Sequence, residues 1–410
     1  MDAARTSRPG DARADPTTVA ALIADLAASS GGRPADLTRL AGLLEDRFAG
    51  RTLAAGADLA LLTAAEGLDA HGWGPRDVAE IVRRRAGGAR VVLALDVLAA
   101  VAARGPRGAG ARDAELADLG AETWWDRAAP LVEQWTTWRG VTRADALVAS
   151  LALVHLWRTL PSLPRLAVEA HAPEGVDPKV LARVRALLAK AESTAFPEEA
   201  EALSAKAQEL MGRHALEQAM VGGTAASGER PASARRIWLD APYTSAKSSL
   251  VHQVAAANRC RAVSLDALDM VTVVGDEADL GGVELLVTSL LVQADRAMIA
   301  AGRASPQRSR TRSFRHAFLL AYATRIGERL AEAAHEAQAR ARAELGESLL
   351  PVLAARAEVV ERTVGELFPR VTRRRFSVGN GAGWAAGRAA ADAARLSPER
   401  GALAPERPGG

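Results

Sequence analysis

Hydrophobic positions recur at helical spacing through the first part of the 410-residue chain. In PTTVAALIADLAAS, the apolar residues fall at intervals of three and four, which predicts an amphipathic helix. In GWGPRDVAEIVRRR, Pro75 stands where a first helical turn tolerates proline, and an apolar stripe follows it. Similar segments continue to about residue 168. The pattern therefore predicts a helical region over residues 16–170.

The pattern changes after residue 234. RRIWLD, CRAVSL and DMVTVVG are short runs typical of strands, and a turn between the last two predicts a β-hairpin. A helical segment separates the first run from the second, and two long helical segments follow the third. The order β-α-β-β-α-α predicts a small sheet with helices packed on one face, an α+β domain over residues 235–345.

The chain as a whole is predicted to be mainly α with a small α+β unit. Its Pro-, Gly- and Arg-rich ends predict disorder at residues 1–15 and 397–410. The composition of residues 222–234 predicts a flexible linker. Two further segments are a helical hairpin at residues 177–221 and a C-terminal helix with a basic, glycine-rich tail at residues 346–396.

The hairpin contains the stretch LLAKAESTAFPEEAEALSAKAQELM, which predicts two helices around a short turn. Pro197 restarts the chain as a helix, and Glu198 and Glu199 lie in a first turn that favours negative charge. His214 falls on the apolar stripe and has no second ligand at metal spacing, which favours a core or rim position. Since no catalytic group is evident, we interpret the hairpin as a docking element.

The stretch KVLARVRALLAKAESTAFPEEAEALSAKAQELMGRHAL resembles the hairpin called domain of unknown function 2786, which occurs in actinobacteria, phages and other mobile elements. The following chain is similar to domain of unknown function 7168, which commonly follows this hairpin. AKSSLVHQVAAANRCRAV, SFRHAFLLAYATRIGERL and GAGWAAGRAAADAARL carry that similarity. The resemblance spans about residues 177–396. It implies an architecture and a mobile-element context, and no chemistry.

Composition changes this picture little. The chain is 49% hydrophobic and only 4% aromatic, which favours helix packing through small residues. Its net charge is +3, and 48 of its 52 basic residues are arginine. A GC-rich genome produces the same excess of Arg and Ala, so only local clustering can indicate a polyanionic partner. The N-terminal residues lack an apolar signal core, and no run of about 18 apolar residues appears. We expect a cytoplasmic protein without a membrane partner.

No motif predicts a cofactor. YTSAKSSL lies where a phosphate loop would, but Ala241 and Ala246 occupy positions that require glycine; a plain helix start capped by Thr244 or Ser245 is the alternative. The seven histidines form no close ligand pair, so no metal site is predicted. Cys260 is the only cysteine, which excludes an intrachain disulfide. Its neighbouring arginines would activate the thiol, unless it is a small buried strand residue, which is the more common role.

Tryptophan is concentrated in the N-terminal half of the chain. Six of the eight indoles lie there, either as a ligand platform or as fillers between helices, which is the more common role. They are Trp73, Trp124, Trp125, Trp135, Trp138 and Trp157.

Two tracts concentrate arginine without acidic residues, GRASPQRSRTRSFR and PRVTRRRF. Flexible Arg-rich segments can follow a phosphate backbone, because charge neutralisation releases counterions without a fixed geometry. A solvated loop that reflects codon bias is the alternative. Aromatic residues at four-residue spacing after Phe314 favour a core over base stacking. The predicted phosphate-binding residues are Arg308, Arg310, Arg312, Arg315, Arg373, Arg374 and Arg375.

Three functional hypotheses follow. The first is a non-enzymatic protein that binds DNA or RNA through these arginines. The second is a hydrolase whose site is assembled in the α+β domain; no catalytic residue is identified, and the positions to inspect are His252, Asp276, Gln293 and His316. The third is a protein-interaction module, or a homo-oligomer, that docks through the hairpin and the Trp-rich half. GWAAGRAAA permits close helix approach within the fold or between subunits, and Arg388 argues against a membrane dimer.

Overall fold

The computed structural model describes residues 15–104, 110–121, 123–166, 178–194, 203, 206–216, 231–304, 311–372 and 380–393. The chain divides into two compact units, residues 1–171 (unit 1) and residues 172–410 (unit 2). The described residues are mainly helical, with one small antiparallel sheet in unit 2. This is the predicted fold class.

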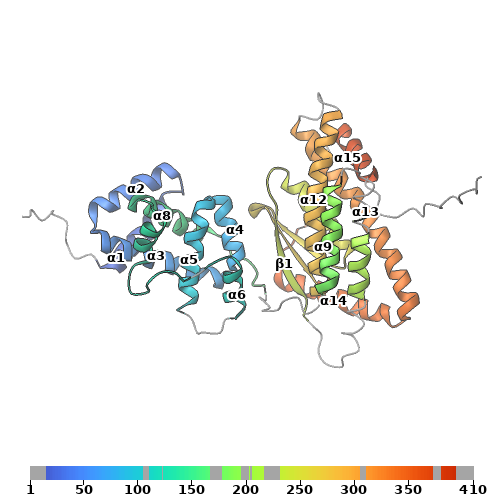
Figure 1. The fold of residues 1–410 in the computed structure, drawn as a ribbon, viewed down its shortest axis with the longest axis horizontal. Coiled ribbons are helices and arrows are strands. Elements are labelled where there is room, and N and C mark those ends of the chain that lie inside the picture. The colour runs from blue at the N-terminus through green and yellow to red at the C-terminus, as the bar shows by residue number, and fades with distance from the viewer. Residues whose placement is uncertain are drawn as a thin grey trace, which may run out of the picture. The chain divides into compact units, whose positions relative to one another are not determined.

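Unit 1 consists of helices in its described residues (Figure 1). The Asp15 carboxylate caps the first helix by accepting from Thr18 N at 2.7 Å, and Thr142 caps the last by accepting from Asp145 N at 3.1 Å. Pro16, Pro34 and Pro75 each stand at a helix start, where a missing N–H is tolerated. The elements are α1 (Pro16–Ser29), α2 (Pro34–Arg47), α3 (Gly50–Ala70), α4 (Pro75–Arg85), the 3₁₀ turn η1 (Gly88–Arg90), α5 (Val91–Ala102), α6 (Gly110–Asp118), α7 (Leu131–Arg139) and α8 (Arg143–Thr159).

The core of unit 1 surrounds α3, which packs against α1, α5, α7 and α8. The close approach of α1 and α3 depends on Gly56, because a Cβ there would overlap the Val19 side chain. Most tryptophans fill gaps between these helices, and only Trp138 is half exposed. The buried indoles are those of Trp73, Trp125, Trp135 and Trp157.

Unit 2 follows the predicted order of elements. Pro178 opens its first described helix, and residues 206–216 are helical as well. The first described helix is α9 (Pro178–Ser193). The elements after residue 216 are β1 (Ser233–Trp238), α11 (Thr244–Ala257), β2 (Arg261–Leu265), the 3₁₀ turn η2 (Asp266–Leu268), β3 (Met270–Gly275), α12 (Glu277–Ala304), α13 (Arg312–Leu345), α14 (Leu349–Leu367) and α15 (Gly381–Ala393).

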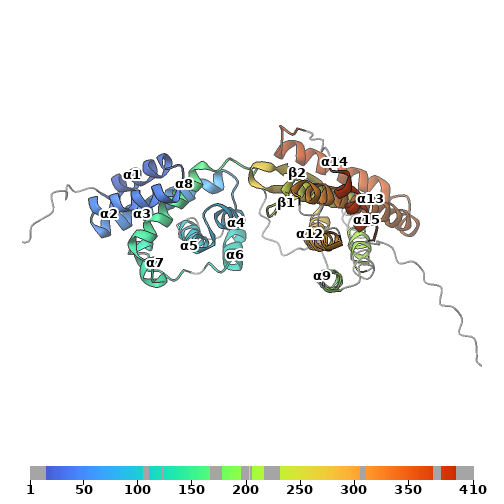
Figure 2. The same ribbon diagram turned by 90° about the horizontal axis from the view of Figure 1, so that it is seen from above.

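The sheet is antiparallel, with β3 between β1 and β2. Val271 and Val273 on β3 belong to the core formed with α11, α12 and α13. The other side chains of β3 are buried too, and α14 contacts β2 and β3. Figure 2 shows the sheet between α14 and α12. Helices therefore cover both faces of the sheet, and the prediction of helices on one face was wrong. The cause is visible in the continuous apolar run MVTVVG, since a strand buried on both faces shows no alternation.

The helical hairpin shares this core. Val184 and Leu188 from α9, with Ala207 and Met211 from the second helix, are buried in the same cluster as α11 and α12. Met211 lies against α12 where Gly282 leaves room, since a Cβ at Gly282 would be 2.7 Å from the Met211 sulfur. The hairpin is thus docked within unit 2.

Helix α12 is the one described helix long and apolar enough to cross a membrane. Length and composition alone also fit the core helix of a soluble protein. In unit 2, Leu280, Val283, Leu286 and Leu290 of α12 are buried in the shared core. One face of α12 therefore packs in the core of unit 2.

Candidate nucleic-acid interface

The structure describes only part of the two arginine tracts. Arg312 and Arg315 lie in the first turn of α13, and both are exposed. The remaining predicted residues lie outside the described residues: Arg308, Arg310, Arg373, Arg374 and Arg375.

The first tract leads into the start of α13 and the second into the start of α15. Thr311 caps α13 by accepting from Phe314 N at 3.2 Å. Asn380 caps α15 by accepting from Gly383 N at 2.8 Å, and its amide donates to the Ser313 hydroxyl at 3.4 Å. We call this arrangement the paired caps (Thr311, Ser313 and Asn380). It brings together two helix starts that are about 70 residues apart in sequence.

Helix α15 lies against the N-terminal part of α13, and the two helices run in parallel (Figure 1). A Cβ at Gly383 would be 2.5 Å from the Phe314 carbonyl oxygen, and one at Gly387 would overlap the Phe318 carbonyl. These glycines allow the backbones to touch. The close helix approach predicted from GWAAGRAAA therefore occurs within the fold.

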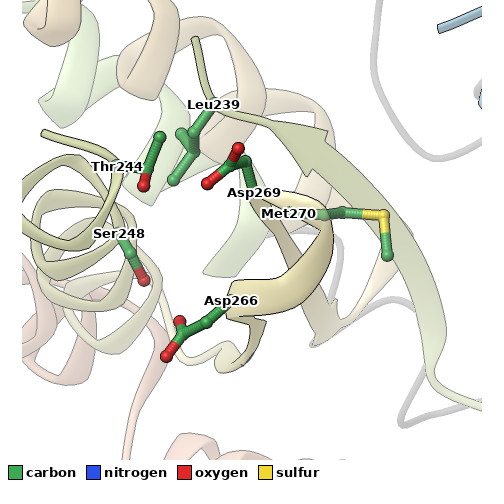
Figure 3. Close-up of a pocket in the computed structure, with 6 residues that line it drawn as sticks. All are labelled: Leu239, Thr244, Ser248, Asp266, Asp269 and Met270. Atoms are coloured by element: carbon green, nitrogen blue, oxygen red, sulfur yellow. The ribbon is translucent and has the colours of Figure 1, made fainter. Parts of the chain in front are cut away.

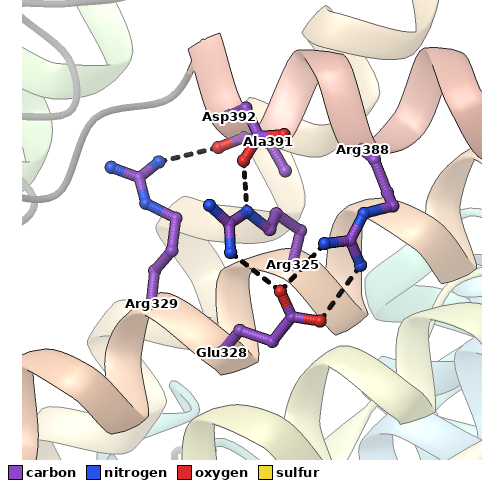
Figure 4. A network of polar contacts seen from close by, with 6 residues as sticks. All are labelled: Arg325, Glu328, Arg329, Arg388, Ala391 and Asp392. Atoms are coloured by element: carbon purple, nitrogen blue, oxygen red, sulfur yellow. Dashed lines mark hydrogen bonds and ion pairs between the residues drawn. The ribbon is translucent and has the colours of Figure 1, made fainter.

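A network of ion pairs holds the C-terminal end of α15 (Figure 4). Glu328 on α13 accepts from Arg388 at 3.0 and 3.1 Å and from Arg325 at 2.8 Å. Arg325 also pairs with Asp392, and Arg329 donates to the Ala391 carbonyl at 2.7 Å. Hydrogen bonds from Arg388 and Arg325 lower the pKa of Glu328. The network neutralises Arg325 and Arg388, so we do not count them as phosphate ligands.

The aromatic residues behind the first tract are buried. Phe314, Phe318 and Tyr322 stack along α13, and their exposed fractions are 3% or less. Ile326 and Leu330 continue the buried stripe. These side chains therefore form core, as predicted, and are not available to stack on bases.

Of the four positions considered for a hydrolase, His252 lies on α11, and His316 contacts this helix from α13. His252 Nε2 is 2.8 Å from the Ser264 hydroxyl on β2, which in turn is 2.7 Å from the Ser248 hydroxyl. Burial lowers the pKa of His252, although nearby Asp266 opposes this. His316 on α13 reaches the Ser245 hydroxyl at 3.1 Å. These two hydrogen bonds link Ser248, Ser264 and His252 into a hydroxyl chain. It was not predicted, since the three residues meet only through the packing of α11 on β2.

A small pocket lies beside this hydroxyl chain (Figure 3). Ser248 reaches it from α11, and Asp266 and Asp269 reach it from the turn between β2 and β3. Asp276 lies at the opposite end of β3, where it pairs with Arg356 at 3.5 Å, and Gln293 contacts Ser289 within α12. The structure therefore does not assemble the four predicted positions into one site.

YTSAKSSL contains a helix start, as one of the two alternatives predicted, but its cap differs. The N-cap position is Tyr243, in a left-handed conformation, and no side chain caps the helix. The expectation of Thr244 or Ser245 as the cap was therefore wrong, because the helix begins one residue earlier than the polar pair suggests. Among the described residues, no group of three or more His, Cys, Asp or Glu side chains could hold a metal ion.

The docked hairpin is similar to a known protein family. Residues 179–218 match the family described as "Protein of unknown function (DUF2786)". The match covers α9 and the helix at residues 206–216, so the DUF2786 hairpin is the part of unit 2 that packs on α12. No curated protein and no solved structure matches the chain.

Proposed function

We propose that the protein binds nucleic acid at the end of unit 2 where α13 and α15 begin. The observation that carries this proposal is the set of paired caps, because it joins the helix starts that follow the two arginine tracts. Arg310 is covalently next to Thr311, and Arg375 precedes Asn380 by five residues. The proposed phosphate-binding residues are Arg308, Arg310, Arg312, Arg315, Arg373, Arg374 and Arg375.

The charge distribution along the chain supports this site. Residues 296–324 contain six arginines and no acidic residue, and residues 367–387 contain four arginines and none. Parallel helices also place their N-terminal ends together, and each such end carries roughly half a positive charge. Because α13 and α15 start side by side, these partial charges add to the arginines. A phosphate backbone matches such a cationic end.

Binding of a labelled oligonucleotide, measured by filter binding at increasing KCl, tests the proposal. We expect the logarithm of the binding constant to fall linearly with the logarithm of salt. Replacing Arg373, Arg374 and Arg375 by alanine should reduce the slope by roughly 0.7 to 0.9 for each phosphate that is no longer neutralised. A variant with Arg33, Arg47 and Arg51 of unit 1 replaced has the same reduction in charge and should retain the slope.

The same titration distinguishes nucleic-acid binding by the two arginine tracts from an arginine excess that only reflects codon bias. Arg312→Ala with Arg315→Ala should likewise give a weaker binding constant and a smaller slope, because both residues belong to the proposed site. Absent binding at low salt, or equal slopes for the tract and control variants, would contradict the proposal. Parallel titrations with single-stranded DNA, duplex DNA and RNA would define the class of nucleic acid.

The family context belongs to the same proposal. We propose that the part of unit 2 after the DUF2786 hairpin corresponds to domain of unknown function 7168 and that the protein acts in the cytoplasm, in a mobile-element setting. The similarity of AKSSLVHQVAAANRCRAV and SFRHAFLLAYATRIGERL supports the first point.

Two alternatives stay predictions. A hydrolase would use the chain from Ser248 through Ser264 to His252, and labelling of Ser248 by a fluorophosphonate would distinguish it from a binding protein. A protein-interaction module would show a complex or homo-oligomer by mass photometry, independently of salt-sensitive nucleic-acid binding.

A further inference from the structure

The hydroxyl chain of unit 2 joins two serines to an imidazole. Ser248 and His252 lie one helical turn apart on α11, so they share a face of that helix. Ser264 on β2 bridges them, because its Oγ is 2.7 Å from Ser248 Oγ and 2.8 Å from His252 Nε2. Both are ordinary hydrogen-bond distances. A proton can therefore pass from Ser248 through Ser264 to the imidazole.

The hydroxyl chain ends at the small pocket (Figure 3). Ser248 lines the pocket from α11, and Asp266 and Asp269 line it from the turn between β2 and β3. Leu239 and Met270 also line it. Its empty space is about 170 Å³, less than the roughly 300 to 1,000 Å³ of sites for drug-sized ligands. The pocket therefore has room for an acyl group of a few carbon atoms.

We propose that Ser248 is a nucleophile that takes an acyl group from a small, uncharged ester, with Ser264 as proton relay and His252 as general base. Ser248 Oγ attacks the carbonyl carbon and forms the new C–O bond, while its proton moves to Ser264 and the Ser264 proton moves to His252 Nε2. The C–O bond of the ester then breaks, and the imidazolium gives its proton to the departing alkoxide. Water repeats these steps on the acyl-serine and releases the carboxylic acid.

The charges at the pocket select this class of substrate. Asp266 and Asp269 repel anions, so a phosphate ester or an acidic substrate is disfavoured, whereas an uncharged ester meets no such repulsion. Thr244 brings the first turn of α11 to the same pocket. The N–H groups of a first turn have no acceptor within their helix, and the helix dipole favours negative charge there. This turn can therefore donate to the carbonyl oxygen as it becomes negative.

His252 is in the protonation state that a general base requires. Burial lowers the pKa of His252 below its ordinary value of 6.5, and nearby Asp266 opposes this effect. The imidazole is therefore neutral at pH 7, while Asp266 favours the imidazolium that forms during the reaction. The rate of acylation should rise with pH as His252 loses its proton, with a midpoint below 6.5.

Incubation of the full chain with p-nitrophenyl acetate tests the proposal. We expect release of p-nitrophenolate that saturates with substrate, and an intact-mass adduct of one acetyl group that tandem mass spectrometry places on Ser248. Ser248→Ala should lose both signals. Ser249→Ala removes a neighbouring buried hydroxyl outside the hydroxyl chain and should keep them. p-Nitrophenyl phosphate should not be cleaved, because the pocket repels anions.

Variants of the other two members distinguish a relay from a purely structural hydrogen bond. His252→Gln should lower the rate constant of acylation about a hundredfold or more and remove its pH dependence. Ser264→Ala should lower kcat with little change in KM, and Ser264→Thr should restore most of kcat because it keeps the hydroxyl. Circular dichroism of each variant checks that the fold is retained.

The wild-type chain decides the matter if a variant does not fold. An acetyl adduct on lysine alone, or no release of p-nitrophenolate above that of the urea-unfolded chain, would overturn the proposal. Equal kcat for Ser264→Ala and the wild type would remove Ser264 from the relay. These experiments contain no nucleic acid, so their failure would leave the proposed nucleic-acid binding untouched.

Discussion

At the residue scale, Cys260 shows how burial overrides neighbouring charge. Arg259 and Arg261 flank it in sequence, and positive charges so close to a thiol can lower its pKa and activate it. In the fold the thiol is 1% exposed and donates to the Asn258 carbonyl at 3.3 Å. Burial and nearby Asp279 raise the pKa of Cys260 well above its ordinary value, against the effect of Arg259. Arg259 is also held by Asp279, and Arg261 by Glu361.

We therefore expect Cys260 to be inert in the native chain. With DTNB at pH 8, it should react only as fast as the protein unfolds, because the thiol is both protonated and enclosed. In urea the same sample should release one equivalent of thiolate product. Complete labelling within seconds under native conditions would show that the arginines, and not burial, control this thiol.

At the element scale, the α13–α15 pair depends on two glycines. Adding a methyl group at Gly387 would press on the Phe318 carbonyl and on the Ala321 methyl, 2.9 Å away. Gly365 on α14 has nothing within 4 Å of the position that its Cβ would take. The same substitution should therefore have opposite effects at the two positions.

We expect Gly387→Ala to lower the free energy of unfolding by about 1 to 3 kcal/mol, the usual cost of overpacking. Gly365→Ala should raise it by up to about 1 kcal/mol, because alanine favours the helix. Urea denaturation of both variants, followed by circular dichroism, measures the difference. A Gly387→Ala variant as stable as the wild type would mean that the two helices separate easily.

Local sequence patterns predicted the helices and strands of unit 2 better than they predicted which of these elements pack together. The runs RRIWLD, CRAVSL and DMVTVVG became β1, β2 and β3, because strand and turn preferences act over a few residues. The paired caps and the position of α14 across the sheet could not be predicted, since each joins segments some 70 to 100 residues apart. Of the predicted phosphate-binding residues, only Arg312 and Arg315 lie in the described part of the chain, so the site itself stays a prediction.

At the scale of the whole molecule, the chain contains two separate cores. The tryptophan-filled core around α3 belongs to unit 1, and the DUF2786 hairpin shares the core of unit 2 with the sheet and its helices. Each unit has more than 150 residues, enough to bury a core of its own.

We expect residues 1–171 and residues 172–410 to fold when expressed separately. Each fragment should unfold cooperatively on heating, at the midpoint of one of two transitions in the full chain. Circular dichroism and calorimetry of the fragments and the full chain would check this. A fragment without a cooperative transition would show that its core is incomplete.

The glycines and the paired caps together give α15 a single seating on α13. A slide of one helical turn, roughly 6 Å, in one direction would drive the Ala391 methyl toward the Phe318 carbonyl, where Gly387 now fits. A slide in the other direction would withdraw Asn380 from Ser313 and Arg388 from Glu328. We therefore expect only one register of α15 on α13. In any other register the helix would lose either its close backbone contact or its capping and ion-pair contacts, so α15 should be either fully docked or detached.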